Sequence, residues 1–200
     1  MTDQPTRPPP GTPRAREPRF VMCAKLREVF SPDECARVIE TAEGFGLEQG
    51  VVRADDVDTS IRDSQIARFG KSETTAWIYD RIFDVVGPLN RQTWRFDLAG
   101  AEVLQFAAYG IGGHYDWHLD VGVSYPFTMR KVTVAVQLSD PASYDGGDFE
   151  ALYGMQTDVA PRDLGGVIVF PSFVLHRVTP ITRGIRHSLN AWIHGELPFK

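Results

Sequence analysis

The chain has 200 residues, of which 42% are hydrophobic and 24% are charged, and its formal net charge is −5. These values are typical of one globular domain, and the acidic balance offers no long-range attraction to nucleic acid or an anionic membrane, so we expect neither partner. No apolar run is long enough to span a bilayer and no signal peptide is visible, which predicts a cytoplasmic protein. The only cysteines, Cys23 and Cys35, indicate no disulfide framework and are expected to be buried as small hydrophobic residues.

The chain divides into a tail and a domain. Residues 1–18 contain six prolines and no segment able to form a core, which predicts a disordered tail. Residues 19–200 are expected to form a single domain, with a helix-rich part at 19–100 and a β-rich core at 101–195.

The helix-rich part contains two clear helical patterns. A strand is predicted over 20–30 and a helix over 31–46, in which Ser31 can cap the first turn and Gly44 can end the helix. Residues 72–90 predict a second helix with an apolar stripe that packs on the core, formed by Ile78, Ile82, Val85 and Val86.

From residue 103 the pattern changes to short strands separated by Gly, Pro, Asp and Ser. Such a series predicts an α+β, mostly β protein whose core is a sandwich or barrel. The eight strands are expected at 103–109, 115–121, 131–139, 147–152, 157–160, 166–170, 175–179 and 186–194.

The stretch HYDWHLDVG, which starts at residue 114, offers more metal ligands than one ion needs. Alternate side chains of a regular strand point to the same face, so all four candidates are expected on one side. Two rival pairs result, His114 with Asp116 and His118 with Asp120.

A third ligand and a cation follow later in the chain. His176 opens one predicted strand, and Arg186 opens the next, ten residues further on. Two histidines and one carboxylate leave coordination positions open and suit Fe(II) and dioxygen, while an arginine can bind a carboxylate through two parallel hydrogen bonds.

These residues carry a family resemblance. The spacing Tyr109-x-x-Gly112-x-x-Tyr115-x-x-His118-x-Asp120 resembles that of the prolyl 4-hydroxylase-like iron(II)/2-oxoglutarate oxygenases. The segments DPASYDGGDFE and GGVIVFPSFVLHRVTPITRGIRHSLNAW look similar to bacterial PKHD-type hydroxylases. The resemblance implies a double-stranded β-helix core, of the jelly-roll or cupin-like kind, with N-terminal helices packed on it.

The resemblance also selects between the rival pairs. The family pattern has a tyrosine three residues before the first ligand, so it implies that Fe(II) is held by His118, Asp120 and His176. His114 and Asp116 are then expected to be solvated polar residues or, as the alternative, residues that contact the metal ligands or lie at the pocket entrance. The implied co-substrates are 2-oxoglutarate and O2, with ascorbate as a reductant.

The last predicted strand supports a binding pocket independently of the family. Strand alternation separates a polar face from a mostly apolar one that contains His187. Alternation takes His187 away from the polar face, and both His187 and His194 are expected to be structural or exposed. The polar face comprises Arg186, Ser188, Asn190 and Trp192.

Roles for these residues follow from the resemblance. Contacts to 2-oxoglutarate are expected from Arg186, Ser188, Tyr109 and Gln137, although relatives more often have an apolar or aromatic residue at the position of Gln137. The substrate pocket is expected to include Tyr115, Asn190, Trp192 and Arg62.

The implied function is hydroxylation of an aliphatic C–H, of a prolyl or other amino-acid side chain, free or in a peptide. The carboxylate at Asp120 favours hydroxylation over halogenation. Alternatives are a non-catalytic sensor that binds iron or 2-oxoglutarate and, on the same fold, a nucleic-acid demethylase, which the acidic charge balance disfavours.

The substrate itself stays open at this stage. Arg62 and Arg68 could meet a substrate carboxylate, although exposed, solvated positions are expected for both. An acidic cluster, Asp55, Asp56 and Asp58, would suit an amine instead.

Overall fold

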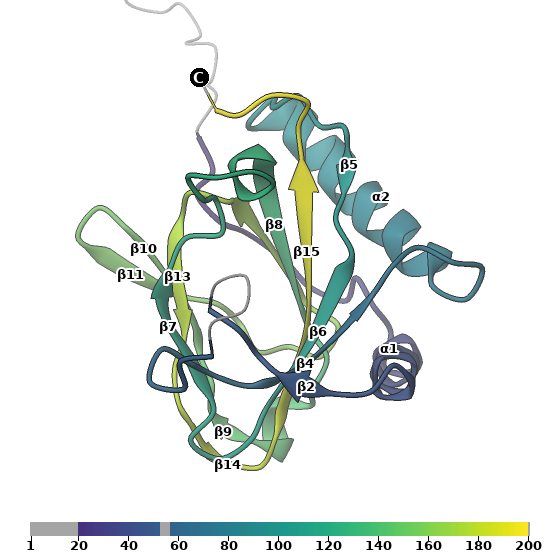
Figure 1. The fold of residues 1–200 in the computed structure, drawn as a ribbon, viewed down its shortest axis with the longest axis vertical. Helices are drawn as coiled ribbons and strands as arrows, with labels where there is room; N and C mark the ends of the chain where they lie inside the picture. The colour runs from purple at the N-terminus through teal and green to yellow at the C-terminus, as the bar shows by residue number, and fades with distance from the viewer. Residues whose placement is uncertain (1–19, 53–56, 200) are drawn as a thin grey trace, which may run out of the picture.

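The computed structural model describes residues 20–52 and 57–199 (Figure 1). The tail predicted at 1–18, together with Asp55 and Asp56, lies outside these residues. The described part is mostly β, with two α-helices. No helix within it is long and apolar enough to cross a lipid bilayer.

Helix α1 (Pro32–Gly44) begins as the sequence predicts. The backbone N–H of Glu34 donates to Ser31 Oγ at 3.1 Å, and the Ser31 N–H donates to the Glu34 carboxylate at 2.9 Å. This reciprocal pair satisfies two N–H groups that the first turn leaves unpaired. Gly44 is the last helical residue, and Gly46, at φ 81°, redirects the chain.

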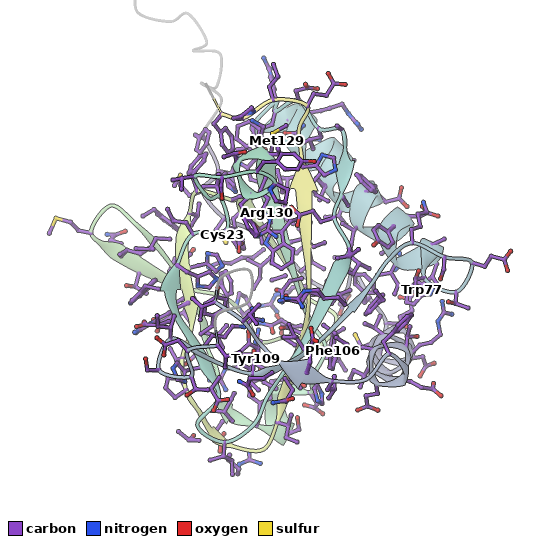
Figure 2. All side chains as sticks on the ribbon, viewed as in Figure 1. Cys23, Trp77, Phe106, Tyr109, Met129 and Arg130 are labelled. Carbon is purple, nitrogen blue, oxygen red and sulfur yellow. The ribbon has the colours of Figure 1, made fainter. Side chains whose placement is uncertain are left out.

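Helix α2 (Ala76–Gln92) packs its predicted stripe against the core. Ile78, Ile82 and Val86 are buried and Val85 is half-buried. Both helices cover one face of the larger sheet (Figure 1), and their apolar side chains form one cluster with the residues of that face. Trp77 of α2 and Phe106 of that face, both labelled in Figure 2, pack in this cluster. The predicted packing of the N-terminal helices is confirmed.

The larger sheet has eight strands, with β15 near its centre and β5 paired to the end of β15. Its pairs are antiparallel throughout. In order across the sheet the strands are β1 (Ala24–Leu26), β12 (Val167–Pro171), β8 (Arg130–Gln137), β15 (Arg186–His194), β6 (Leu104–Tyr109), β4 (Gln65–Phe69) and β2 (Glu48–Gln49), with β5 (Gly100–Ala101) off this path.

The smaller sheet has five strands and faces the uncovered side of the larger one. From β6 to β15 the chain passes repeatedly between the two sheets, so strands from both enclose one pocket. The strands are β11 (Gln156–Val159), β10 (Phe149–Tyr153), β13 (Leu175–Val178), β7 (His114–His118) and β3 (Arg62–Asp63). A separate pair is formed by β14 (Ile181–Arg183) and β9 (Asp145–Gly146).

The eight strands predicted from residue 103 onward are all present, whereas the N-terminal prediction was incomplete. The strand expected over 20–30 is only the three residues of β1, and β2, β3, β4 and β5 were not predicted; nor were the short strands β9 and β14 of the C-terminal part. These segments are two to five residues long, too short for a recognisable alternation. Their pairing with distant strands, not their own pattern, makes them part of the sheets.

Candidate active site

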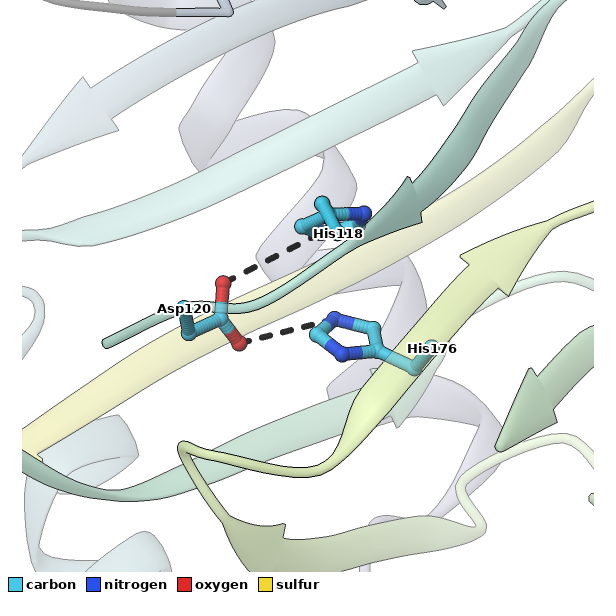
Figure 3. A group of neighbouring side chains, drawn as sticks. All are labelled: His118, Asp120 and His176. Carbon is cyan, nitrogen blue, oxygen red and sulfur yellow. Dashed lines mark ion pairs between the residues drawn. The ribbon is translucent and has the colours of Figure 1, made fainter. Parts of the chain in front are cut away.

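Three side chains from two strands of the smaller sheet and the turn after one of them converge on a point between the sheets (Figure 3). Asp120 Oδ1 lies 3.9 Å from His118 Nε2, and Asp120 Oδ2 lies 3.5 Å from His176 Nε2. The ligand atoms of all three residues lie within 4.8 Å of one another. The arrangement is a candidate metal centre with two imidazole nitrogens and one carboxylate, a donor set that fits Fe(II) with open positions.

Backbone carbonyls orient both imidazoles toward this point. His118 Nδ1 lies 2.7 Å from the Asp116 carbonyl oxygen, and His176 Nδ1 lies 2.9 Å from that of Val174. A carbonyl only accepts hydrogen bonds, so each Nδ1 must carry the proton. Each Nε2 therefore presents its lone pair to the centre, as a metal ligand must.

The charge states match this role. Burial and the neighbouring His176 lower the pKa of His118 to about 3, so its ring is neutral at neutral pH. Burial alone would raise the pKa of Asp120, but the two histidines and the Thr133 hydroxyl together lower it below its usual value, so the carboxylate is ionised. Both groups are thus ready to bind a cation without losing a proton.

A β-bulge decides which side chains of β7 face the centre. His118 is paired with His176, but Tyr115 is paired with Val178, so three residue steps on β7 span two on β13. The extra residue brings Tyr115 and His118 to the same face, where their rings stack with centroids 3.5 Å apart. A regular strand would have turned Tyr115 away.

The expectation that all four HYDWHLD ligands share one face is therefore wrong. His114 does not reach the centre: its ring nitrogens lie near the carbonyls of Gly112 and Ser60. Asp116 is exposed and accepts the N–H of Trp117. The strand predicted over 115–121 ends earlier, at His118. Asp120 therefore follows β7 and does not lie in a strand.

Neighbouring strands fix the position of Asp120. The Thr133 hydroxyl donates to Asp120 Oδ2 at 2.7 Å, and the Asp120 N–H donates to the Ser172 carbonyl at 3.1 Å. Arg130, held by two hydrogen bonds to Glu102, also donates to the Asp120 carbonyl at 3.3 Å. The carboxylate is therefore held in one orientation before any ion binds.

Arg186 is a buried cation in the same pocket. It is 1% exposed, and its Nη2 donates to Gln137 Oε1 at 2.8 Å. Its Nε and Nη1 have no hydrogen-bond partner among the described residues. A buried guanidinium with two unpaired N–H directions fits a carboxylate ligand.

All predicted site residues except Gln137 line this pocket. The polar face of β15 does so as alternation predicted, while Leu189, Ala191 and Ile193 pack on the opposite side in the core. Gln137 does not line the pocket and accepts the hydrogen bond of Arg186 Nη2, so its position does not support the predicted direct contact with 2-oxoglutarate. The residues that line the pocket as predicted are Arg62, Tyr109, Tyr115, His118, Asp120, His176, Arg186, Ser188, Asn190 and Trp192.

Several lining residues were missed by sequence reasoning. Thr133 and Gln105 are polar residues in otherwise apolar strands, a signal that could have identified them. The apolar residues carry no such signal, because the sequence does not distinguish aromatic and aliphatic side chains that line a pocket from those in the hydrophobic core. The missed residues are Gln105, Thr133, Ala135, Phe149, Phe170 and Val178.

Arg62 is the main correction among the polar residues. It was named as a candidate pocket residue, but a solvated position was favoured; it is 4% exposed and lines the pocket, with its guanidinium 4.7 Å from the Tyr115 ring centroid. Arg68 is exposed, as expected, and forms an ion pair with Glu48. Asp58 is half-buried, and its carboxylate accepts hydrogen bonds from Ser60.

The remaining candidates lie away from the centre. His187 stacks on Phe106 at a centroid distance of 5.4 Å, on the helix side of the larger sheet. Cys35 is buried and Cys23 half-buried, and burial raises their thiol pKa to about 11 and about 12. Both cysteines stay protonated at neutral pH and act as apolar packing, as the sequence predicted.

Comparison with known proteins agrees with this fold and site. Residues 104–194 match the family model described as the 2OG-Fe(II) oxygenase superfamily. The matched segment contains the three metal-ligand candidates and Arg186.

Curated relatives narrow the class. The PKHD-type hydroxylase YbiX of Escherichia coli O9:H4 is 30% identical over 175 residues, which cover 82% of this chain and 75% of that protein. A PKHD-type hydroxylase of Cupriavidus metallidurans is 41% identical over 95 residues, and one of Teredinibacter turnerae is 34% identical over 98 residues; these matches span 41% and 43% of those relatives' lengths. The chain belongs to the prolyl 4-hydroxylase-like 2OG-Fe(II) oxygenases, in the family of the PKHD-type hydroxylases.

Solved structures share the fold. A Pseudomonas putida prolyl-4-hydroxylase superposes with a TM-score of 0.69 and 24% identity, over 86% of this chain and 92% of that one. A prolyl hydroxylase from Trichoplax adhaerens superposes with a TM-score of 0.73 and 17% identity, over 87% and 84%. At these identities the likeness concerns the fold alone.

Proposed function

We propose that this chain is an Fe(II)- and 2-oxoglutarate-dependent dioxygenase that hydroxylates an aliphatic C–H, of a prolyl or other amino-acid side chain, free or in a peptide. The core is then a double-stranded β-helix, which the passage of the chain between two facing sheets supports. One observation carries the proposal: the unpaired Nε and Nη1 of buried Arg186 lie in the same pocket as the His118, Asp120 and His176 centre.

The protein's first task is to hold the metal. His118 and His176 supply neutral Nε2 atoms, and Asp120 supplies a carboxylate that Thr133 and the backbone keep in place. Bound iron and 2-oxoglutarate supply the oxidising chemistry: one O2 oxidises substrate C–H to C–OH and 2-oxoglutarate to succinate and CO2. Three protein ligands leave the positions that this reaction requires.

The second task is to bind the co-substrate. Arg186 is suited to the far carboxylate of 2-oxoglutarate, because its free N–H groups sit in a low-dielectric site where a charge-assisted pair is strong. Ser188 and Tyr109 line the same part of the pocket and supply hydroxyl groups. Gln137 acts by orienting Arg186 through Nη2.

The third task is to shape the space around the reacting carbon. Phe149 and Phe170 pack against His176, with ring centroids 5.4 and 4.7 Å from it, and limit access of water. Tyr115, Asn190 and Trp192 line the pocket and are available to the substrate. The Trichoplax adhaerens prolyl hydroxylase was solved in complex with a peptide fragment, which supports a peptide as one substrate form.

The test is succinate formation from 2-oxoglutarate in air, with Fe(II) and ascorbate, against amino acids and prolyl peptides. His176→Ala and Arg186→Gln are compared with His194→Ala and Arg183→Gln. Arg183 is exposed and paired with Asp145, so it is a matched control for loss of one guanidinium.

Turnover that requires Fe(II), His176 and Arg186, and survives both control changes, supports the proposal. A folded, iron-loaded protein that forms no succinate, even without substrate, contradicts it and favours a non-catalytic sensor. Oligonucleotide binding with a steep salt dependence would instead favour the demethylase alternative.

A further inference from the structure

Arg62 is a second buried cation in the pocket, and the proposed metal and co-substrate sites do not use it. It lies on β3, in the smaller sheet, whereas Arg186 lies on β15, in the larger sheet. Both side chains line the same pocket. The pocket therefore has guanidinium groups contributed by both sheets.

The Arg62 guanidinium is held in place before any ligand binds. Its Nε donates to Ser64 Oγ at 3.0 Å and its Nη1 donates to the Val51 carbonyl at 3.1 Å. Gly50 lies against the group: a Cβ there would stand 2.8 Å from Arg62 Nε. A cation fixed in this way loses little conformational entropy when it binds an anion.

No carboxylate among the described residues pairs with Arg62. Of the other buried arginines, Arg130 is neutralised by two hydrogen bonds to Glu102, whereas Arg186, like Arg62, has no carboxylate partner among the described residues and donates to the amide oxygen of Gln137. Within the described part of the chain, Asp120 is the only acidic residue that lines the pocket, and it belongs to the metal centre. Because burying an unpaired charge is unfavourable, an anionic ligand is the expected partner for Arg62.

The location of Arg62 points to the substrate. Its guanidinium lies 4.7 Å from the centroid of the Tyr115 ring, which stacks on the metal-ligand candidate His118. The opposing cation, Arg186, is taken up by the proposed co-substrate. An anion at Arg62 would lie on the His118 side of the pocket, beside the space left for the reacting molecule.

We propose that Arg62 binds a carboxylate of the substrate. The substrate class is then an amino acid bound through its α-carboxylate, or a peptide bound through a carboxylate at its C-terminus or on a side chain. This inference rests on the proposed function, because it assigns the anion to the substrate of that site. It predicts that an otherwise identical amide binds poorly.

The experiment measures binding by calorimetry to the Zn(II)-loaded protein saturated with 2-oxoglutarate. The probes are the twenty free amino acids, Ala-Ala-Xaa tripeptides, the C-terminal amides of both sets, and amidated peptides that contain Asp or Glu. Comparison of these sets distinguishes the source of the carboxylate. The proteins are wild type, Arg62→Gln, Arg62→Lys and Arg68→Gln, and each is checked for cooperative unfolding. Arg68 is an exposed arginine on the adjoining β4 and serves as the matched control.

At least one carboxylate probe is expected to bind wild type about 100-fold more tightly than its amide, as for a charge-assisted pair. Arg62→Gln should remove this preference, Arg62→Lys should restore part of it, and Arg68→Gln should retain it. The loss of affinity caused by amidation of the probe and the loss caused by Arg62→Gln should not add, because both changes remove the same contact.

Three results would overturn the inference: no probe binds the folded protein, carboxylates bind no better than amides, or Arg62→Gln weakens both forms equally. The last result would show a merely structural role. Wild-type succinate formation is measured in parallel. Succinate without carboxylate preference rejects the role of Arg62 alone, whereas absence of succinate from the iron-loaded protein rejects the proposed function separately.

Discussion

Strands β15 and β7 both supply the pocket, but they follow different rules. β15 alternates from Arg186 to Ile193, before a register shift at its end: Leu189, Ala191 and Ile193 are completely buried beneath the helices, and the polar residues between them face the pocket. Its pairing with β6 is regular over five consecutive residue pairs. When one face of a strand packs in the core and the other lines a polar pocket, a shift in register by one residue would bury polar groups in the core.

β7 belongs to the smaller sheet and contains a bulge. Neither of the two described helices covers its other face; Trp117 there is half-buried and contacts Arg177, whose guanidinium is 4.6 Å from the indole centroid. An extra residue can be accommodated where one face is open to solvent. Alternation therefore predicts side-chain direction reliably only where packing on both faces of a strand enforces it.

Single-residue deletions would test this difference most strongly. Deleting Leu189 from β15 should abolish folding, because one half of the strand would turn its polar face toward the helices. Deleting Asp116 from β7 should be tolerated with a loss of about 1–3 kcal/mol, since Tyr115 and His118 would then be two residues apart and still share a face. Circular dichroism and urea unfolding measure both, and a folded Leu189 deletion would contradict the comparison.

Side-chain truncation gives the next largest effect. Leu189→Ala should lower the free energy of unfolding by about 2–5 kcal/mol, because it leaves a cavity in a fully buried site. Leu119→Ala, directly after β7 at a position 48% exposed, should change it by less than about 0.5 kcal/mol. If urea titrations gave the two variants a similar loss of unfolding free energy, β15 would not be more tightly constrained by packing than β7.

A substitution on β8, the strand beside β15, should show whether Gln137 positions Arg186 for binding 2-oxoglutarate. Gln137→Leu removes the acceptor for Arg186 Nη2, and the affinity for 2-oxoglutarate should fall about 10-fold, the value of one hydrogen bond. Gln65→Leu, at an exposed position on β4, is the control and should leave the affinity unchanged. Calorimetric titration with 2-oxoglutarate measures both, and equal affinity in Gln137→Leu and wild type would exclude a positioning role.

The smallest expected effect concerns pH and the helix-facing side of β15. Burial lowers the pKa of His187 below its usual value of 6.5, so the unfolded chain binds more protons than the folded one as pH falls through that value. The contribution of neutral His187 to the stability of the fold is therefore present above about pH 6.5 and is lost as the pH falls below it. His187→Phe should flatten this part of the curve of unfolding free energy against pH, measured by chemical denaturation. A steeper curve would contradict a lowered pKa of His187 in the folded protein.

Much of the site was predictable because its chemistry is visible in residue types. The residue types of the HYDWHLD stretch, His176 and Arg186 indicate a metal site with a nearby cation, the family resemblance selects His118 with Asp120, and the pattern of β15 separates pocket from core. Arg62 was named as a candidate for the pocket, but its burial was not predictable in the same way. Its burial depends on β3 pairing with β7 at Tyr115, a contact between two-residue and five-residue strands that no local pattern announces.

By itself, the sequence determined the helices, the eight strands after residue 103 and the polar face of β15, whereas the choice of His118 with Asp120 came from the family resemblance. Local caps, periodicity and motif spacing encode these features because they depend on residues close together in the chain. Only the tertiary structure decided the bulge that turns Tyr115 toward His118, the strands added by the N-terminal part, and the burial of Arg62. These features depend on which distant strands pair and on which faces remain open, so they are set by packing between sheets and not by any one segment.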